Sequence, residues 1–347
     1  MDISRLSPRQ REILRAVVRD YVLTAEPVGS RTLSRKYDLG LSAATIRNEL
    51  SDLEEEGLLR QPHTSAGRVP SDSGYRVFVD SLMERATLPV DKQALIESLD
   101  TQCQDLEELL HQTARLTAVL SGCTAVVRPP RQRGSRIRTV SVVPIGEAEV
   151  LLVLVTTAGA VSHSVVNLRS AASPEEVALL SNFLNAQLRD RPLDALTYRT
   201  MREVTAQMER YQAHLEDLLG RLLTQTETFS RVIVSNTAVL AQQPEFSESA
   251  KVSPILAFLE REAEMAELMD HMVEAEPVNV QIRIGHESAV PDLAECSVVT
   301  ATYSVDGAAA GEIAVLGPTR LDYSAAVAAV EAMADRLTRL LGGRGLT

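Results

Sequence analysis

Residues 30–56 predict two short helices joined by a tight turn. Ser30 is expected to cap the first helix and Ser42 the second, because a serine hydroxyl accepts a hydrogen bond from the free N–H groups of a first helical turn. The turn between them contains Gly40 where a positive φ is needed. The residues expected on the buried face of the second helix are Ile46, Leu50 and Leu53. Two helices in this order predict a helix-turn-helix, the motif that places its second helix in the major groove of DNA.

Segments on both sides complete this module. Ser7-Pro8-Arg9-Gln10 has the spacing of a capping box with proline at the first helical position, so a further helix should precede the pair. After the pair, Leu58–Gln61 and Arg68–Pro70 bracket a short polar segment, which predicts a β-ribbon, or wing. A helical corner in an α-domain would explain the two helices but not the ribbon. The sequence therefore favours a DNA-binding winged helix-turn-helix.

Side chains that face outward at the start of the third helix are candidates for reading base edges. Arg47 can bind guanine through two hydrogen bonds and Asn48 can bind adenine in the same way, while small neighbours permit close approach to a groove. In the wing, Arg68 should hold phosphate, unless it braces the ribbon by pairing with Glu54 or Glu55. The candidate DNA-binding residues are Ser42, Ala43, Ala44, Thr45, Arg47 and Asn48, with Arg31 from the preceding helix and His63, Thr64, Ser65 and Arg68 from the wing.

The distribution of charge is compatible with DNA contact through one small module. Residues 1–85 hold 13 basic and 13 acidic side chains, so the net charge of −12 belongs entirely to the rest of the chain. Within the first 48 residues, 9 basic side chains outnumber 5 acidic ones. A random fluctuation would explain these counts equally well, so the motifs carry the argument.

Other features disfavour several classes of protein. The three cysteines, Cys103, Cys123 and Cys296, lie far apart without a C-x-x-C pair, which argues against a disulfide framework and a zinc site. No P-loop, nucleophile elbow, H-E-x-x-H or dinucleotide-binding motif occurs, so we expect neither an enzyme nor a cofactor or metal. No apolar run approaches the roughly 20 residues of a membrane span. The N-terminus also lacks a signal peptide, so a cytoplasmic protein is expected.

The rest of the chain predicts strands, then helices, then strands again. Strand-like segments occur within 124–168 and 278–316, and helices are expected over 91–120, 174–188 and 323–341. This order suggests one α/β domain interrupted by an insertion. Inside the insertion, a heptad-like seam of apolar residues can pack on its own domain or on a second copy of the chain. The seam consists of Val204, Met208, Tyr211, Leu215, Leu218 and Leu222.

Several long motifs resemble the heat-inducible transcription repressor HrcA family of bacteria. The N-terminal ones are Glu26–Leu33, Ser42–Leu50, Asp52–Gly57 and Gln61–Pro70. Two more, at 284–287 and 317–323, extend the resemblance over essentially the whole chain. Ala43, Leu50 and Ser71 depart from the family pattern, but none of these departures removes a side chain assigned to DNA.

The resemblance implies a multidomain α+β fold. It consists of a winged helix-turn-helix at 1–88, a GAF-like α/β domain at 89–196 and 277–347, and an inserted helical and β dimerisation domain at 197–276. With this layout, the seam residues are assigned to dimerisation.

The resemblance also implies a function. A homodimer represses chaperone operons by binding an inverted-repeat operator, and a GroEL-type chaperonin keeps the repressor active. The alternative is a winged-helix regulator that senses a metabolite in the GAF-like domain. We expect the two C-terminal motifs to be structural instead, with Asp322 capping the last helix and Arg320 paired with a carboxylate.

Overall fold

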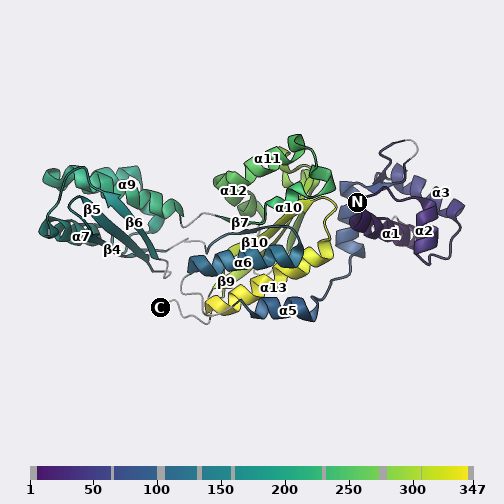
Figure 1. Ribbon diagram of the computed structural model, residues 1–347, viewed down its shortest axis with the longest axis horizontal. Coiled ribbons are helices and arrows are strands. Elements are labelled where there is room, and N and C mark those ends of the chain that lie inside the picture. Colours follow the sequence, from purple (N-terminus) through teal and green to yellow (C-terminus); the bar gives the residue numbers. More distant parts are fainter. Residues whose placement is uncertain are drawn as a thin grey trace. The chain divides into compact units, whose positions relative to one another are not determined.

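The computed structural model describes residues 6–63, 66–99, 106–130, 135–157, 161–228, 232–272, 280–305 and 307–342. The chain divides into two compact units, and helices and sheets occur in both (Figure 1). The first unit comprises Met1–Val127, Ile233–Ser304 and Glu312–Thr338, and the second comprises Arg128–Val232, Val305–Gly311 and Arg339–Thr347.

The first unit begins with an N-terminal module. Its elements are α1 (Pro8–Thr24), α2 (Ser30–Lys36), α3 (Ala43–Glu55), β1 (Leu59–Arg60), β2 (Val69–Pro70), α4 (Asp72–Val77) and the π-helical turn η2 (Phe78–Leu82). The predicted capping box is present, because Ser7 accepts from the Gln10 N–H at 3.2 Å and Gln10 accepts from the Ser7 N–H at 2.9 Å. Gly40 has a φ of +62°, as the turn between α2 and α3 requires. The cap predicted for Ser30 is wrong: Gly29 occupies that position, and Ser30 is the first residue of α2.

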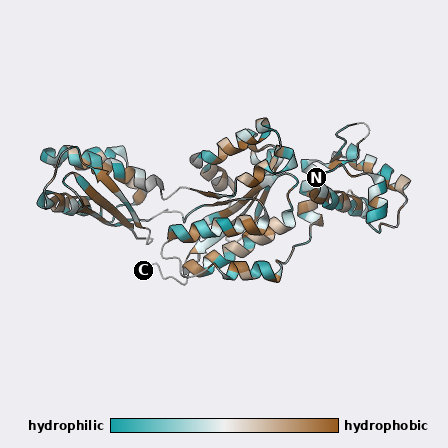
Figure 2. Cartoon of the chain, in the orientation of Figure 1, coloured by the Kyte–Doolittle hydropathy of each residue, from teal (hydrophilic) through white to brown (hydrophobic). Residues whose placement is uncertain are grey.

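A five-stranded sheet forms the centre of the first unit. In spatial order its strands are β7 (Ile233–Ser235), β3 (Thr124–Val127), β10 (Ala308–Pro318), β9 (Cys296–Val305) and β8 (Gln281–Ile284). The helices of this part are α5 (Val90–Glu97), α6 (Leu106–Ser121), α10 (Ala238–Ala241), α11 (Ser249–Glu260), α12 (Glu262–Met272) and α13 (Tyr323–Gly342). Nearly every residue of β9 and most of β10 are buried, because helices cover the sheet (Figures 1 and 2). The single helix predicted over 91–120 is two helices, α5 and α6.

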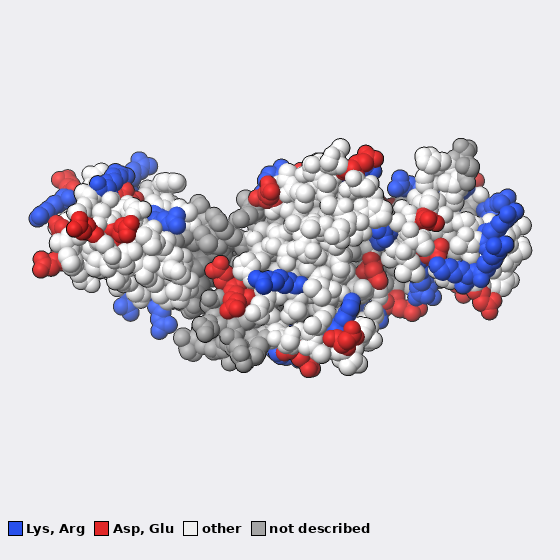
Figure 3. Space-filling view, in the orientation of Figure 1, with Lys and Arg blue, Asp and Glu red and all other residues white. Residues whose placement is uncertain are grey.

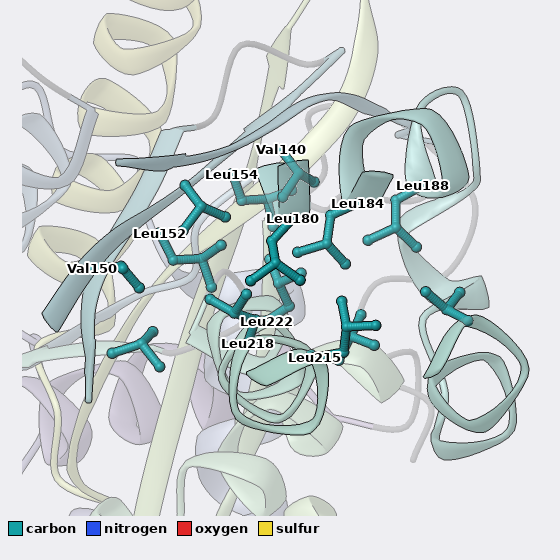
Figure 4. Packing of buried hydrophobic residues seen from close by; sticks show 14 of the residues in the cluster. Val140, Val150, Leu152, Leu154, Leu180, Leu184, Leu188, Leu215, Leu218 and Leu222 are labelled. Atoms are coloured by element: carbon teal, nitrogen blue, oxygen red, sulfur yellow. The ribbon is translucent and has the colours of Figure 1, made fainter. Parts of the chain in front are cut away.

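The second unit is built on a separate three-stranded antiparallel sheet. Its strands are β4 (Ile137–Pro144), β5 (Glu149–Thr156) and β6 (Val161–Asn167), with β5 in the middle. Its helices are α7 (Pro174–Leu188), α8 (Tyr198–Thr205) and α9 (Gln212–Thr228). Alternate residues of β5 are buried, and they pack against leucines of α7 and α9 in one hydrophobic core (Figure 4). The period of two follows from the pleat, which turns successive side chains to opposite faces.

This division differs from the predicted domain boundaries. We expected the insertion at 197–276, but the second compact unit begins near Arg128 and its central segment ends at Val232. The reason is that β4, β5 and β6 bury their inner face under α7 and α9, so they belong with the helices that follow them. Conversely, α11 and α12, predicted within the insertion, belong to the first unit.

The seam predicted for dimerisation lies inside the chain's own core. Val204, Leu215, Leu218 and Leu222 have no exposed surface. In Figure 4, the three leucines of α9 lie beneath β5 and next to α7. The other two seam residues, Met208 and Tyr211, pack against the same cluster. The intrachain core therefore already occupies these side chains, so they do not offer a surface to a second copy.

The helices can also be compared with the span of a bilayer. Among those in the described part of the chain, none is long and apolar enough to cross a membrane.

Candidate nucleic-acid interface

The start of α3 is held by its N-cap. Ser42 Oγ accepts from the Thr45 N–H at 3.1 Å and lies 2.9 Å from Thr45 Oγ1. Both hydroxyls are thus engaged with each other, and their main role is to fix the first turn. Below them Ile46, a buried residue, anchors the helix on the module's core, together with Leu50 and Leu53. A rigid, capped first turn is what a base-reading helix needs, because the side chains it carries then have fixed origins.

Two long polar side chains leave this turn toward solvent. Arg47 and Asn48 are exposed, as is Ala44, while Ala43 is half-buried. No ion pair to Arg47 is found within the part of the chain that the structure describes. Both side chains can therefore reach a ligand without first breaking a contact. The sequence predicted this exposure correctly.

The preceding helix adds basic side chains to the same end of the module. Arg31 and Arg35 of α2 are exposed. Lys36 is different: it pairs with Asp20, a carboxylate buried in α1, and this hydrogen bond raises the pKa of Lys36. Figure 3 shows Lys and Arg side chains gathered over α2 and α3. Sequence reasoning named Arg31 but missed Arg35, although its spacing of four residues from Arg31 places both on one helical face.

The ribbon after α3 is short, and its base is fixed by Arg68. The Arg68 guanidinium pairs with Glu54 at 2.8 Å and is only 16% exposed. Its backbone exchanges two hydrogen bonds with Val28, at 2.8 and 2.9 Å. Gly67 permits this approach, because a Cβ there would overlap the Val28 carbonyl. Of the two roles predicted for Arg68, the structure therefore favours bracing of the ribbon over contact with phosphate.

The tip of the ribbon is only partly described. His63 is exposed, and its carbonyl accepts from the Ala66 N–H at 2.8 Å. Thr64 and Ser65, also predicted to contact DNA, lie outside the described residues.

The motif at 317–323 has the structural roles that we expected. Asp322 Oδ1 accepts from the Ala325 N–H at 3.1 Å and so caps α13. Arg320 pairs with Glu245, with 2.6 Å between Nε and Oε1.

Comparisons with known proteins identify the family. Residues 107–327 match the family model described as the HrcA protein C-terminal domain. The heat-inducible transcription repressor HrcA of Moorella thermoacetica is 38% identical, over 97% of this chain and 98% of that protein. Its namesake from Gloeobacter violaceus is 39% identical, over 97% of this chain and 94% of that protein. A crystal structure described as a hypothetical protein shares the fold, with a TM-score of 0.69, 23% identity and coverage of 98% and 99% of the two chains. This chain therefore belongs to the heat-inducible transcription repressor HrcA family.

Proposed function

We propose that this chain represses heat-shock genes by binding operator DNA through a winged helix-turn-helix formed by residues 1–88. The observation that carries the proposal is the capped start of α3, which presents Arg47 and Asn48 to solvent beside the exposed Arg31 and Arg35. Arginine and asparagine are the side chains best suited to guanine and adenine edges in the major groove. Ala44 leaves room for the helix to approach the bases.

The bound state requires two copies of the module. One such module contacts only a few base pairs, which is too little to single out an operator among the competing sites of a genome. A two-fold symmetric homodimer doubles the contact and demands an inverted-repeat site. We therefore propose a homodimer on an inverted repeat.

Because the seam is internal, we propose that the dimer uses the opposite face of the three-stranded sheet. The strand register places eleven side chains on this face: Thr139, Ser141, Val143, Glu149, Leu151, Val153, Val155, Val161, His163, Val165 and Asn167. Val143, Val161 and Val165 are 43%, 61% and 51% exposed. Of the eleven, only Glu149, at the first position of β5, is charged, so the central part of the face would meet a second copy of itself without repulsion between like charges.

The family resemblance supplies the regulatory part of the proposal. The repressed genes are chaperone operons, and a GroEL-type chaperonin maintains the active repressor. The alternative, a metabolite-sensing regulator, would need a small-molecule site in the GAF-like domain, whereas a cleft of about 460 Å³ is lined mostly by residues of 1–88, with only the start of α13 from that domain. A small molecule bound to protein purified from cells would favour that alternative.

Selection of binding sites from random duplex DNA tests the proposal directly. The full-length chain should enrich an inverted repeat. Arg47→Ala should bind that repeat about 5- to 150-fold more weakly, since a bidentate contact to guanine contributes about 1–3 kcal/mol. Arg202→Ala, which removes an exposed arginine from α8 in the second unit, is the matched control and should bind normally. Enrichment of no sequence, or of an isolated half-site at full affinity, would contradict the proposal.

A further inference from the structure

Arg76 of α4 joins the N-terminal module to the turn after β8. Its Nε donates to Glu287 Oε1 at 2.9 Å, and its Nη2 donates to the Ile282 carbonyl at 2.7 Å and to Glu287 Oε2. Glu287 is fixed from its other side by the Ile284 N–H at 2.9 Å. Burial acts to raise the pKa of Glu287, but the hydrogen bonds from Arg76 and Ile284 outweigh it and leave the pKa lowered. A two-pronged arginine–carboxylate pair fixes direction as well as distance.

Arg320 makes a second connection, to the end of α1. Its Nη1 donates to the Val22 carbonyl at 2.7 Å, while Nε and Nη2 hold Glu245 at 2.6 and 3.3 Å. Val22 is in the last turn of α1, where backbone carbonyls lack partners within the helix and the helix dipole attracts a cation. Arg320 is 13% exposed and Glu245 21%, so water screens this pair less than it screens a surface pair.

Between these two connections, the module and the sheet domain share an apolar contact. Tyr75, next to Arg76, packs its ring against Tyr323 of α13, with 5.7 Å between ring centroids, and both residues are 1% exposed. One turn earlier on the same face of α4, His286 Nδ1 lies 3.0 Å from Asp72 Oδ2. Gly285 makes the close approach possible, because a Cβ there would overlap the Asp72 carboxylate.

We infer that the Arg76–Glu287 pair, together with Arg320, which Glu245 holds against the Val22 carbonyl, forms a clamp that sets the direction of α3 relative to the sheet domain, so that these four are positioning residues for operator recognition. The inference rests on the proposed binding of an inverted repeat by a dimer. It assigns a DNA-related role to residues that lie in α4, in the two C-terminal motifs and, for Glu245, in the short turn at 244–246, away from the exposed start of α3.

The physical reason is the spacing of half-sites. A dimer binds both halves of an inverted repeat only when its two recognition helices are one helical turn of DNA, or a multiple of it, apart. Residues 83–89, which connect η2 to α5, form no helix or strand. Glu84 pairs with Arg15 and Arg19, and Arg85 pairs with Glu331, but these are exposed ion pairs, which stabilise little. With the clamp, each module arrives already oriented. Without it, the second half-site must be bound at an entropic cost.

The test uses the full-length chain carrying Glu287→Gln and Glu245→Gln together. Glutamine keeps the shape of each side chain but removes its charge and one of its two acceptors. The matched control is Asp80→Asn, because Asp80 accepts from the same Arg76 at 3.1 Å but lies within the module. Two probes are compared at low salt by fluorescence anisotropy: the inverted repeat selected by the wild-type chain, and one half of it.

The double variant should lose about tenfold or more in affinity for the inverted repeat, within the roughly 5- to 150-fold that couplings between sites reach. Its half-site affinity should stay within about twofold of wild type, because α3 itself is unchanged. Trypsin should also cleave faster after Arg85, which is 78% exposed in the connecting segment. Asp80→Asn should behave as wild type in all three measurements.

Two results would overturn the inference. One is an unchanged affinity for the inverted repeat in the double variant. The other is an equal loss on both probes, which would indicate damage to the module instead of lost positioning. If the double variant does not fold, the two single variants are measured in the same way, and each should show a smaller loss confined to the inverted repeat. A wild-type chain that does not prefer an inverted repeat would instead contradict the proposed function, so the two failures are distinguishable.

Discussion

Replacement of Leu218 by alanine separates a core role of the seam from a dimer role. Leu218 has no exposed surface and lies in the core between β5, α7 and α9. Truncating such a leucine removes its transfer free energy and leaves a cavity, which together cost about 2–5 kcal/mol. For a compact unit of this size, roughly 4 °C is lost for each kcal/mol, so the melting temperature of the second unit should fall by roughly 8–20 °C.

The assay pairs thermal unfolding with sedimentation velocity over a range of protein concentrations. Leu218→Ala should unfold earlier but should sediment as wild type at temperatures where it is folded. Val165→Glu, on the exposed face of the same sheet, is the complementary variant: it should melt near the wild-type temperature and sediment as a monomer. If Leu218→Ala keeps its stability and sediments as a monomer, the assignment of the seam to an intrachain core is wrong.

Three further predictions concern single side chains. Arg47→Ala should lose discrimination at one base position in each half-site, which binding to a panel of substituted operators would measure; equal losses at every position would contradict base contact. Arg68→Ala should lower the free energy of unfolding of the N-terminal module by about 1 kcal/mol and leave the salt dependence of DNA binding unchanged, whereas Arg35→Ala should reduce the salt slope by about one. A reduced salt slope in Arg68→Ala, with unchanged stability, would instead make Arg68 the phosphate contact. Burial raises the pKa of Cys123 and Cys296 to about 12, so both should stay protonated and react with a thiol reagent at pH 8 only as the protein unfolds. The measurement uses a variant in which Cys103 is replaced by serine, and fast reaction of its folded form would contradict this prediction.

Local features of the fold could be predicted because their causes are local. The capping box at Ser7, the positive φ at Gly40 and the exposed start of α3 each depend on residues within one or two turns. The sequence also indicated that Asp322 would cap α13, for the same reason. Each of these interactions forms within a few positions along the chain, so no knowledge of the tertiary fold was needed.

The predictions that were wrong concern packing and pairing partners, which the spacing of residues in the sequence does not identify. A repeat of three and four residues buries a helix equally well in its own core or against another copy, so the environment of Leu218 was ambiguous. Strands 137–167 alternate as any half-buried sheet does, and nothing in that alternation says which strands they join. An arginine near a wing is equally suited to phosphate and to a carboxylate, and Glu54 decided the outcome for Arg68.

The strand order has a consequence for how the protein is made. Thr124 in β3 pairs with Leu316 in β10, and Arg320 reaches back 298 positions to the carbonyl of Val22. At a synthesis rate of roughly 5–20 residues per second, β3 waits about 10–40 s for its C-terminal neighbour. During that interval an apolar strand has an unpaired edge, and the surface around Tyr75 lacks Tyr323. The N-terminal module is thus synthesised first but gains its contacts with Arg320 and Tyr323 last. Each newly made repressor spends its least protected period in a state prone to aggregation.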